Sequence, residues 1–120
     1  MVRIKRVYAP PAPEDGYRVL VDRLWPRGLA KEAAAVELWL KEIAPSTELR
    51  RWFGHDPARW PAFAERYRQE LETPERAAAL ERLRQAERER GRVTLLFGAR
   101  DAALTHAALL RDLLSGAPEG

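Results

Sequence analysis

The chain of 120 residues contains no cysteine. This absence excludes disulfides, thiolate zinc sites and cysteine nucleophiles, and it is usual for a protein of a reducing compartment. Long apolar runs are also missing, since no stretch approaches the ~20 residues that a membrane-spanning helix needs. The first residues carry charges inside their only apolar stretch, unlike a secretory signal. We therefore expect a soluble, cytoplasmic protein without membrane contact.

Lysine is scarce as well, because 18 of the 21 basic residues are arginine, and the formal net charge is only +3. The planar guanidinium fork suits carboxylate and phosphate, although a composition rich in arginine and alanine can also reflect a GC-rich genome. Most of these charges lie beside glutamates, so the basic balance alone does not indicate nucleic-acid binding. The length suits one domain with one core. We expect residues 1–120 to form a single α/β domain whose end, 115–120, frays.

Two apolar runs predict the centre of a sheet. Residues 17–22 and 93–97 are dense in aliphatic side chains without polar alternation, which indicates strands covered on both faces, as in a parallel sheet. Residues 2–8 are more charged and suit an edge strand. The linker of eight residues after them is too short for a crossover helix, so the first two strands are expected to be antiparallel. Residues 36–42 alternate like a third strand, although they could instead continue a helix.

Capping residues and helical periodicity predict helices in the rest of the chain. A short helical turn is expected over 31–35, and the last helix is expected from about Ala102 to Leu114. The expected N-caps are Ser46, Asp56, Thr73 and Asp101. With the strands, this order predicts a small α/β domain, Rossmann-like, with a largely parallel sheet of about four strands and flanking helices.

The loop after the second strand concentrates functional groups. It reads Asp22-Arg23-Leu24-Trp25-Pro26-Arg27-Gly28 and directly follows a buried strand. Open α/β sheets bind ligands at the carboxyl ends of their strands. The loop at 98–101 would lie at the same edge, beside the loop at 22–28. Arginines and helix N-termini together suit an anion. We therefore expect an anion-binding cleft for a phosphorylated metabolite, a nucleotide or a nucleic-acid phosphate.

The candidate ligand-binding residues of this cleft come from three loops. They are Arg23, Trp25, Arg27, Gly28, Ser46, Arg100 and Asp101. Arg27 is expected to contact the ligand because Gly28 lets the backbone approach closely. Structural alternatives exist: Asp22 could pair with Arg23, Trp25 could pack, and Ser46 and Asp101 could only cap helices.

Asp22 and His55 are the candidate catalytic residues. Asp22 would orient an arginine or act as an acid or base, while His55 could be oriented by Asp56 as a general base or could cap the preceding helix. His106 is expected only at the rim. Two distant histidines without ligand-spaced carboxylates predict no metal site. No phosphate-binding loop, dinucleotide motif or nucleophile elbow is present, so no cofactor is expected and no reaction is specified.

Four blocks of the sequence are similar to a known family. Residues 18–28, 39–46, 49–57 and 94–101 closely resemble the YeaO-like branch of the family called domain of unknown function 488. The resemblance covers nearly the whole chain and implies a Rossmann-like α/β domain, but it supplies no function.

The resemblance also limits what can be carried over to this chain. It implies that Gly98 and Thr105 stand where longer relatives have cysteines, so thiol chemistry in those relatives does not apply here. The pair Asp22 and Arg23, with Arg27, can be carried over.

Two non-catalytic alternatives to the anion cleft remain. A nucleic-acid-binding module predicts a continuous basic surface and an affinity that falls steeply with salt. A protein-interaction module predicts an exposed Trp25 without a concave pocket beside it. The sequence does not indicate the oligomeric state.

Overall fold

The computed structural model describes residues 1–116, and at its centre lies a four-stranded sheet in which all pairings are parallel. The strands, β1 (Val2–Arg6), β2 (Tyr17–Leu20), β3 (Leu38–Trp39) and β4 (Val93–Phe97), lie in the order β1-β4-β2-β3. This arrangement confirms a small α/β domain with a parallel sheet. The fraying expected at 115–120 concerns a segment that lies largely outside the described residues.

The predicted antiparallel pairing of the first two strands is wrong. β4 lies between β1 and β2, and each of them pairs with β4 in parallel. The linker between them needs no helix, because an extended chain covers about 3.3 Å per residue and can return along the sheet within a few residues. Only a short 3₁₀ turn, Pro13–Asp15, interrupts it.

The third strand is present, as favoured from its alternation, but it is shorter than expected. β3 comprises two residues that pair with β2, and a 3₁₀ turn follows at Lys41–Ile43. The five α-helices of the described chain are α1 (Lys31–Ala34), α2 (Thr47–Phe53), α3 (Trp60–Glu70), α4 (Pro74–Arg90) and α5 (His106–Leu114).

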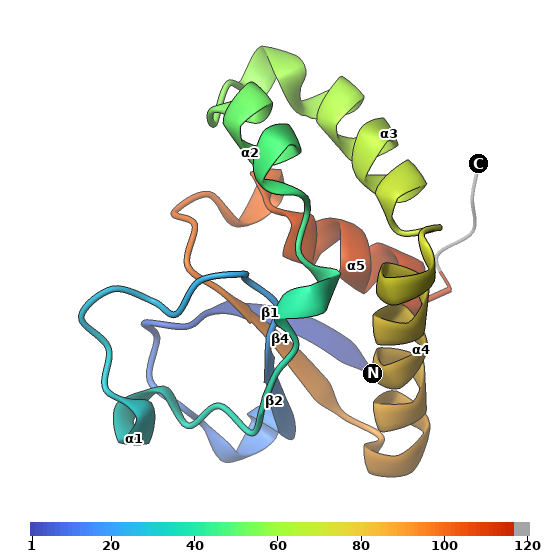
Figure 1. Ribbon diagram of the computed structural model, residues 1–120. Coiled ribbons are helices and arrows are strands. Elements are labelled where there is room, and N and C mark those ends of the chain that lie inside the picture. The colour runs from blue at the N-terminus through green and yellow to red at the C-terminus, as the bar shows by residue number, and fades with distance from the viewer. Residues whose placement is uncertain (117–120) are drawn as a thin grey trace.

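Helices and loops cover both faces of the sheet (Figure 1). α5 packs against β1 and β4, and α4 also contacts β4. α2 and α3 lie together at the end of the sheet to which the strands point, at the top of Figure 1, whereas α1 lies apart from them at the lower left. The carboxyl ends of the strands therefore face the start of α5 and the α2–α3 pair.

Two hydrophobic clusters account for the dense apolar runs. Val19 and Leu95 face the larger cluster with the helices α3, α4 and α5, while Leu20 and Leu96 face a smaller one with Ala34. All five residues of β4 are buried. The lack of alternation in β2 and β4 thus reflects burial on both faces, as the sequence predicts.

A buried ion cluster fixes the loop between β1 and β2. Asp15 is 2% exposed and accepts hydrogen bonds from Lys5 and Arg18, and the Arg18 guanidinium also donates to the carbonyls of Ala34 and Ala35 at the end of α1. Burial by itself raises the pKa of Asp15, but the Ala12 N–H and the two cations outweigh it and hold that pKa below its usual value. The cluster joins loop, strand and helix.

The last helix begins later than predicted. Asp101 caps only a 3₁₀ turn, Ala102–Leu104, by accepting from the N–H of Ala103. Thr105 then has extended backbone and caps α5 by accepting from the N–H of Ala107. His106 is therefore the first residue of α5 rather than one turn inside it. Across the described residues, no helix is long and apolar enough to cross a membrane.

Candidate functional site

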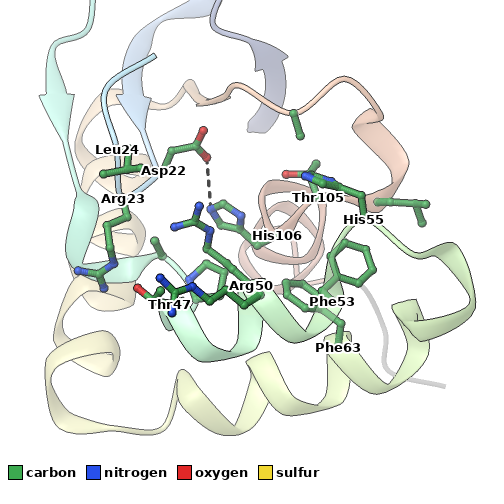
Figure 2. Close-up of a pocket in the computed structure, with 15 residues that line it drawn as sticks. Asp22, Arg23, Leu24, Thr47, Arg50, Phe53, His55, Phe63, Thr105 and His106 are labelled. Carbon is green, nitrogen blue, oxygen red and sulfur yellow. Dashed lines mark ion pairs between the residues drawn. The ribbon is translucent and has the colours of Figure 1, made fainter. Parts of the chain in front are cut away.

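A cavity of about 560 Å³ opens at the carboxyl ends of β2 and β4, between α2 and the start of α5 (Figure 2). Asp22 and Arg23 come from the loop after β2, Arg50 and Arg51 come from α2, and His106 comes from α5. The volume lies within the range of small-molecule sites. The sheet thus gathers polar groups at the edge where an open α/β fold is expected to bind its ligand.

Asp22 is held in place by contacts with both neighbouring strands. One carboxylate oxygen, Oδ2, accepts from the N–H of Gly98 at 2.8 Å, and the backbone carbonyl of Asp22 accepts from the Trp39 indole at 2.8 Å. A side chain at position 98 would crowd the carboxylate, since its Cβ would lie 3.3 Å from Oδ2. The alternative of an Asp22–Arg23 ion pair is wrong, because Asp22 lies instead beside His106, whose Nε2 is 3.7 Å from Oδ1.

His106 lies inside the site, so the expectation that it stays at the rim is wrong. Its side chain is 12% exposed, and its Nε2 lies 2.9 Å from the carbonyl oxygen of Val21. Burial lowers the pKa of His106, while the Asp22 carboxylate and the Val21 carbonyl partly oppose that shift. The imidazole is thus neutral at pH 7 and donates its Nε2 hydrogen to Val21. The ring of Tyr67 packs edge-on against it, with centroids 5.7 Å apart.

Three arginines line the cavity, and Asp22 is the only acidic residue of the described chain that lines it with them. Among residues 1–116, the guanidinium groups of Arg23, Arg50 and Arg51 take part in no ion pair and donate no hydrogen bond. In Figure 2 the side chain of Arg50 extends toward Asp22 and His106. By contrast, the Arg6 guanidinium donates hydrogen bonds to the carbonyls of Gly98 and Ala99. The site therefore offers three unpaired cations to one carboxylate.

The two arginines of α2 were missed from the sequence, although a signal exists. Thr47, Arg50 and Arg51 are spaced three and four residues apart, so they share one face of the helix. Because Ser46 caps α2 next to β3, that face turns toward the strand ends. Combining the predicted cap with helical spacing would have identified these residues.

His55 lines the cavity but is not oriented by Asp56. The Asp56 carboxylate instead accepts from the N–H of Ala58 and lies 3.7 Å from Arg59. His55 has a positive φ of 58°, in the left-handed region that suits glycine and that, among other residues, Asn, Asp and His adopt more often than most. Gly54, the C-cap, ends α2, so the capping role proposed for the histidine belongs to its neighbour. His55 is exposed and faces the cavity.

Three expected ligand residues of the β2 loop lie away from the cavity. Trp25 packs edge-on against Trp39 at 5.5 Å and donates to the carbonyl of Leu29, which matches the packing alternative. Arg27 is exposed, and its carbonyl accepts from the Tyr8 hydroxyl. Gly28 has a φ of 75° and shapes the turn. Residues 22–24 of the loop therefore line the cavity, whereas residues 25–28 lie away from it.

The remaining candidates, Ser46, Arg100 and Asp101, also lie outside the cavity lining. The Ser46 hydroxyl donates to the Glu70 carboxylate at 2.6 Å and accepts from the N–H of Leu49. Arg100 and Asp101 are exposed. The anion-binding argument therefore rests on arginine side chains rather than on the helix N-termini at Ser46 and Asp101.

Several polar groups of the cavity are already engaged by the protein itself. The described residues hold no group of three or more acidic, histidine or cysteine side chains placed to ligate a metal. The Thr105 hydroxyl is buried and occupied by capping. His106 uses its Nε2 hydrogen on a backbone carbonyl, so that nitrogen is not directed at a nucleophile. What remains is a set of unpaired guanidinium groups beside a fixed carboxylate.

The chain has close relatives of similar length. A family model described as "Inactive DUF488-N3 subclade" matches residues 1–119. The chain is 47% identical over 115 residues to the uncharacterized proteins Rv3073c of Mycobacterium tuberculosis and Mb3100c of Mycobacterium bovis, covering 96% of this chain and 94% of each relative. It is 42% identical over 113 residues to the uncharacterized protein YeaO of Escherichia coli, covering 94% of this chain and 96% of YeaO. No solved structure matches it.

Proposed function

Since the chain belongs to the family described as the inactive DUF488-N3 subclade, we propose that it binds a small phosphorylated ligand without converting it. The ligand occupies the cavity at the carboxyl edge of the sheet. Arg23, Arg50 and Arg51 bind its charge, beside the fixed carboxylate of Asp22. In this proposal neither Asp22 nor His55 performs an acid–base step.

The three unpaired arginines around one cavity carry this proposal. Guanidinium groups are costly to gather, because like charges repel and each side chain loses rotamer freedom when it is ordered. An anionic ligand removes that repulsion and accepts several charge-assisted hydrogen bonds, which are the stronger ones. The positions on two separate elements, the loop after β2 and α2, let the groups approach a phosphate from two sides.

The neutral imidazole and the fixed carboxylate support binding over catalysis. General acid–base catalysis needs a group that can exchange a proton with the substrate near neutral pH. Burial lowers the pKa of His106, and its Nε2 hydrogen is engaged by Val21. One oxygen of Asp22 is likewise engaged by Gly98. These contacts rigidify the wall of the cavity, which lowers the entropy cost of ligand binding.

Thermal unfolding in the presence of inorganic phosphate, pyrophosphate and methyl phosphate tests the proposal. A ligand that binds only the folded chain raises its stability, by about 2.7 kcal/mol at a hundredfold excess over Kd. We expect Arg50→Gln to weaken the affinity about ten- to hundredfold, because a hydrogen bond to a charged group contributes about 1.5–3 kcal/mol.

Arg82→Gln is the matched control, since Arg82 is exposed on α4, outside the cavity, and its loss changes the net charge equally. We expect this variant to bind like the wild type. Equal weakening in both variants would show that only the overall charge matters, and an unstabilised wild type with all three probes would refute the anion site.

A further inference from the structure

The cavity is polarised, with charge at one end and apolar rings at the other. In Figure 2, Arg23 and Thr47 lie on one side, and Phe53, Phe63 and His55 lie on the opposite side. All five residues line the same cavity. A spherical inorganic anion would use only the first end, so the shape favours a ligand with two chemically different ends.

The apolar end is an aromatic surface. The rings of Phe53 and Phe63 lie 4.6 Å apart, and the imidazole of His55 lies 6.1 Å from Phe53. The two phenylalanines are anchored in the core, whereas His55 is exposed. Aromatic rings prefer offset or edge-to-face contact with other rings. The surface therefore matches a flat ring better than a flexible polar chain.

The backbone at His55 gives an independent reason to assign its ring a role. Both Gly54 and His55 have positive φ, 52° and 58°, and this region suits glycine. A glycine at the second position would adopt this backbone without the steric cost that a histidine side chain carries. Strain of this kind gathers at ligand-binding sites, and here it sets a side chain over the cavity.

The charged end suits a doubly charged head group. Arg23, Arg50 and Arg51 line the cavity with a single carboxylate of the described chain, Asp22, and burial lowers the pKa of His106. Phosphate monoesters carry between one and two negative charges near pH 7. A monoester also leaves a single bond through which the phosphate connects to a ring at the other end.

We propose that the ligand is a small aromatic phosphate monoester, whose phosphate lies among the arginines and whose ring lies against His55 and Phe53. This inference rests on the proposed function and specifies its ligand class. Nucleoside monophosphates and aryl phosphates both belong to the class, and the cavity is large enough for either.

Calorimetric titration with phenyl phosphate and methyl phosphate tests the inference, since the two probes share the head group and differ in the ring. We expect the wild type to bind phenyl phosphate at least tenfold more tightly. In His55→Gly the backbone relaxes and the ring is lost, so we expect this preference to fall to about threefold or less, while methyl phosphate binds as before. His55→Asn, which also tolerates the left-handed region, is expected to behave in the same way.

Each result separates the ring contact from the anion site. Equal wild-type affinity for the two probes would overturn the aromatic ligand class and leave the anion site standing. An unchanged preference in both His55 variants would overturn the role of His55. Binding of neither probe would refute the proposed function as well. Adenosine 5′-phosphate and free phosphotyrosine, titrated alongside, distinguish the two sources of the class.

Discussion

At the scale of single residues, His106 makes the stability of the fold depend on pH. Burial lowers its pKa in the folded chain, whereas an unfolded histidine titrates near 6.5. As the pH falls below that value, the unfolded chain takes up a proton that the folded chain does not. Stability is therefore lost as the pH falls from about 7 toward the folded pKa, with a slope of at most about 1.4 kcal/mol per pH unit.

Urea unfolding between pH 5 and 8 measures this slope in the wild type and in His106→Gln, whose amide can still donate to Val21. We expect the variant to lose much of the slope above pH 5. His55→Gln is the control, because its exposed side chain has none of the buried contacts of His106, and it should keep the slope. An unaltered slope in His106→Gln would assign the pH dependence to other groups.

Residue by residue, the sequence located part of the site through one physical rule. Asp22 and Arg23 follow a buried strand directly, so they must lie at the carboxyl end of that strand, where the cavity opens. Arg27 and Trp25 lie only a few residues further on, yet the turn at Gly28 and the contact between Trp25 and Trp39 carry them away from the cavity. Which residues of a loop face inward depends on such tertiary contacts, and a single sequence does not show them.

At the scale of elements, the start of α5 decides where His106 lies. Thr105 is 4% exposed and caps the helix, while the exposed Asp101 caps only the 3₁₀ turn before it. We expect Thr105→Ala to destabilise the chain by about 1 kcal/mol, as for other N-caps, and Asp101→Ala to cost clearly less. Urea unfolding at pH 7 measures both, and Thr105→Ser should restore most of the loss. A larger cost at Asp101 would contradict this assignment of the caps.

Elements were easier to predict than their connections. The strands at 17–22 and 93–97 and the helices after Ser46 and Thr73 follow from dense apolar runs, caps and periodicity, which are local properties. The neighbours of each strand are not local. β1 and β2 are adjacent in the chain, but β4 separates them in the sheet. The predicted start of α5 was wrong for a related reason. Asp101 and Thr105 can both cap a helix, and tertiary packing decides which of them begins α5.

For the whole molecule, the strand order places the last strand of the chain at the centre. β4 pairs with β1 on one side, Val2 opposite Val93, and with β2 on the other, Val19 opposite Leu95. A chain that ends at Gly91 lacks the strand that both of these need, as well as α5, which covers the sheet. Isolated strands are unstable without partners. We therefore expect residues 1–91 alone to show no cooperative unfolding transition.

Circular dichroism during urea unfolding measures that transition, and the full-length chain is the reference. Adding a peptide of residues 92–116 to the fragment should restore a cooperative transition, because it supplies β4 and α5 without a covalent link. Recovery would depend on peptide concentration, as for any association. A cooperative transition of the fragment alone would show that α2, α3 and α4 hold a core without the central strand. Such a helical core would still lack the cavity, because Ala99, Thr105 and His106, which line it, come after residue 91.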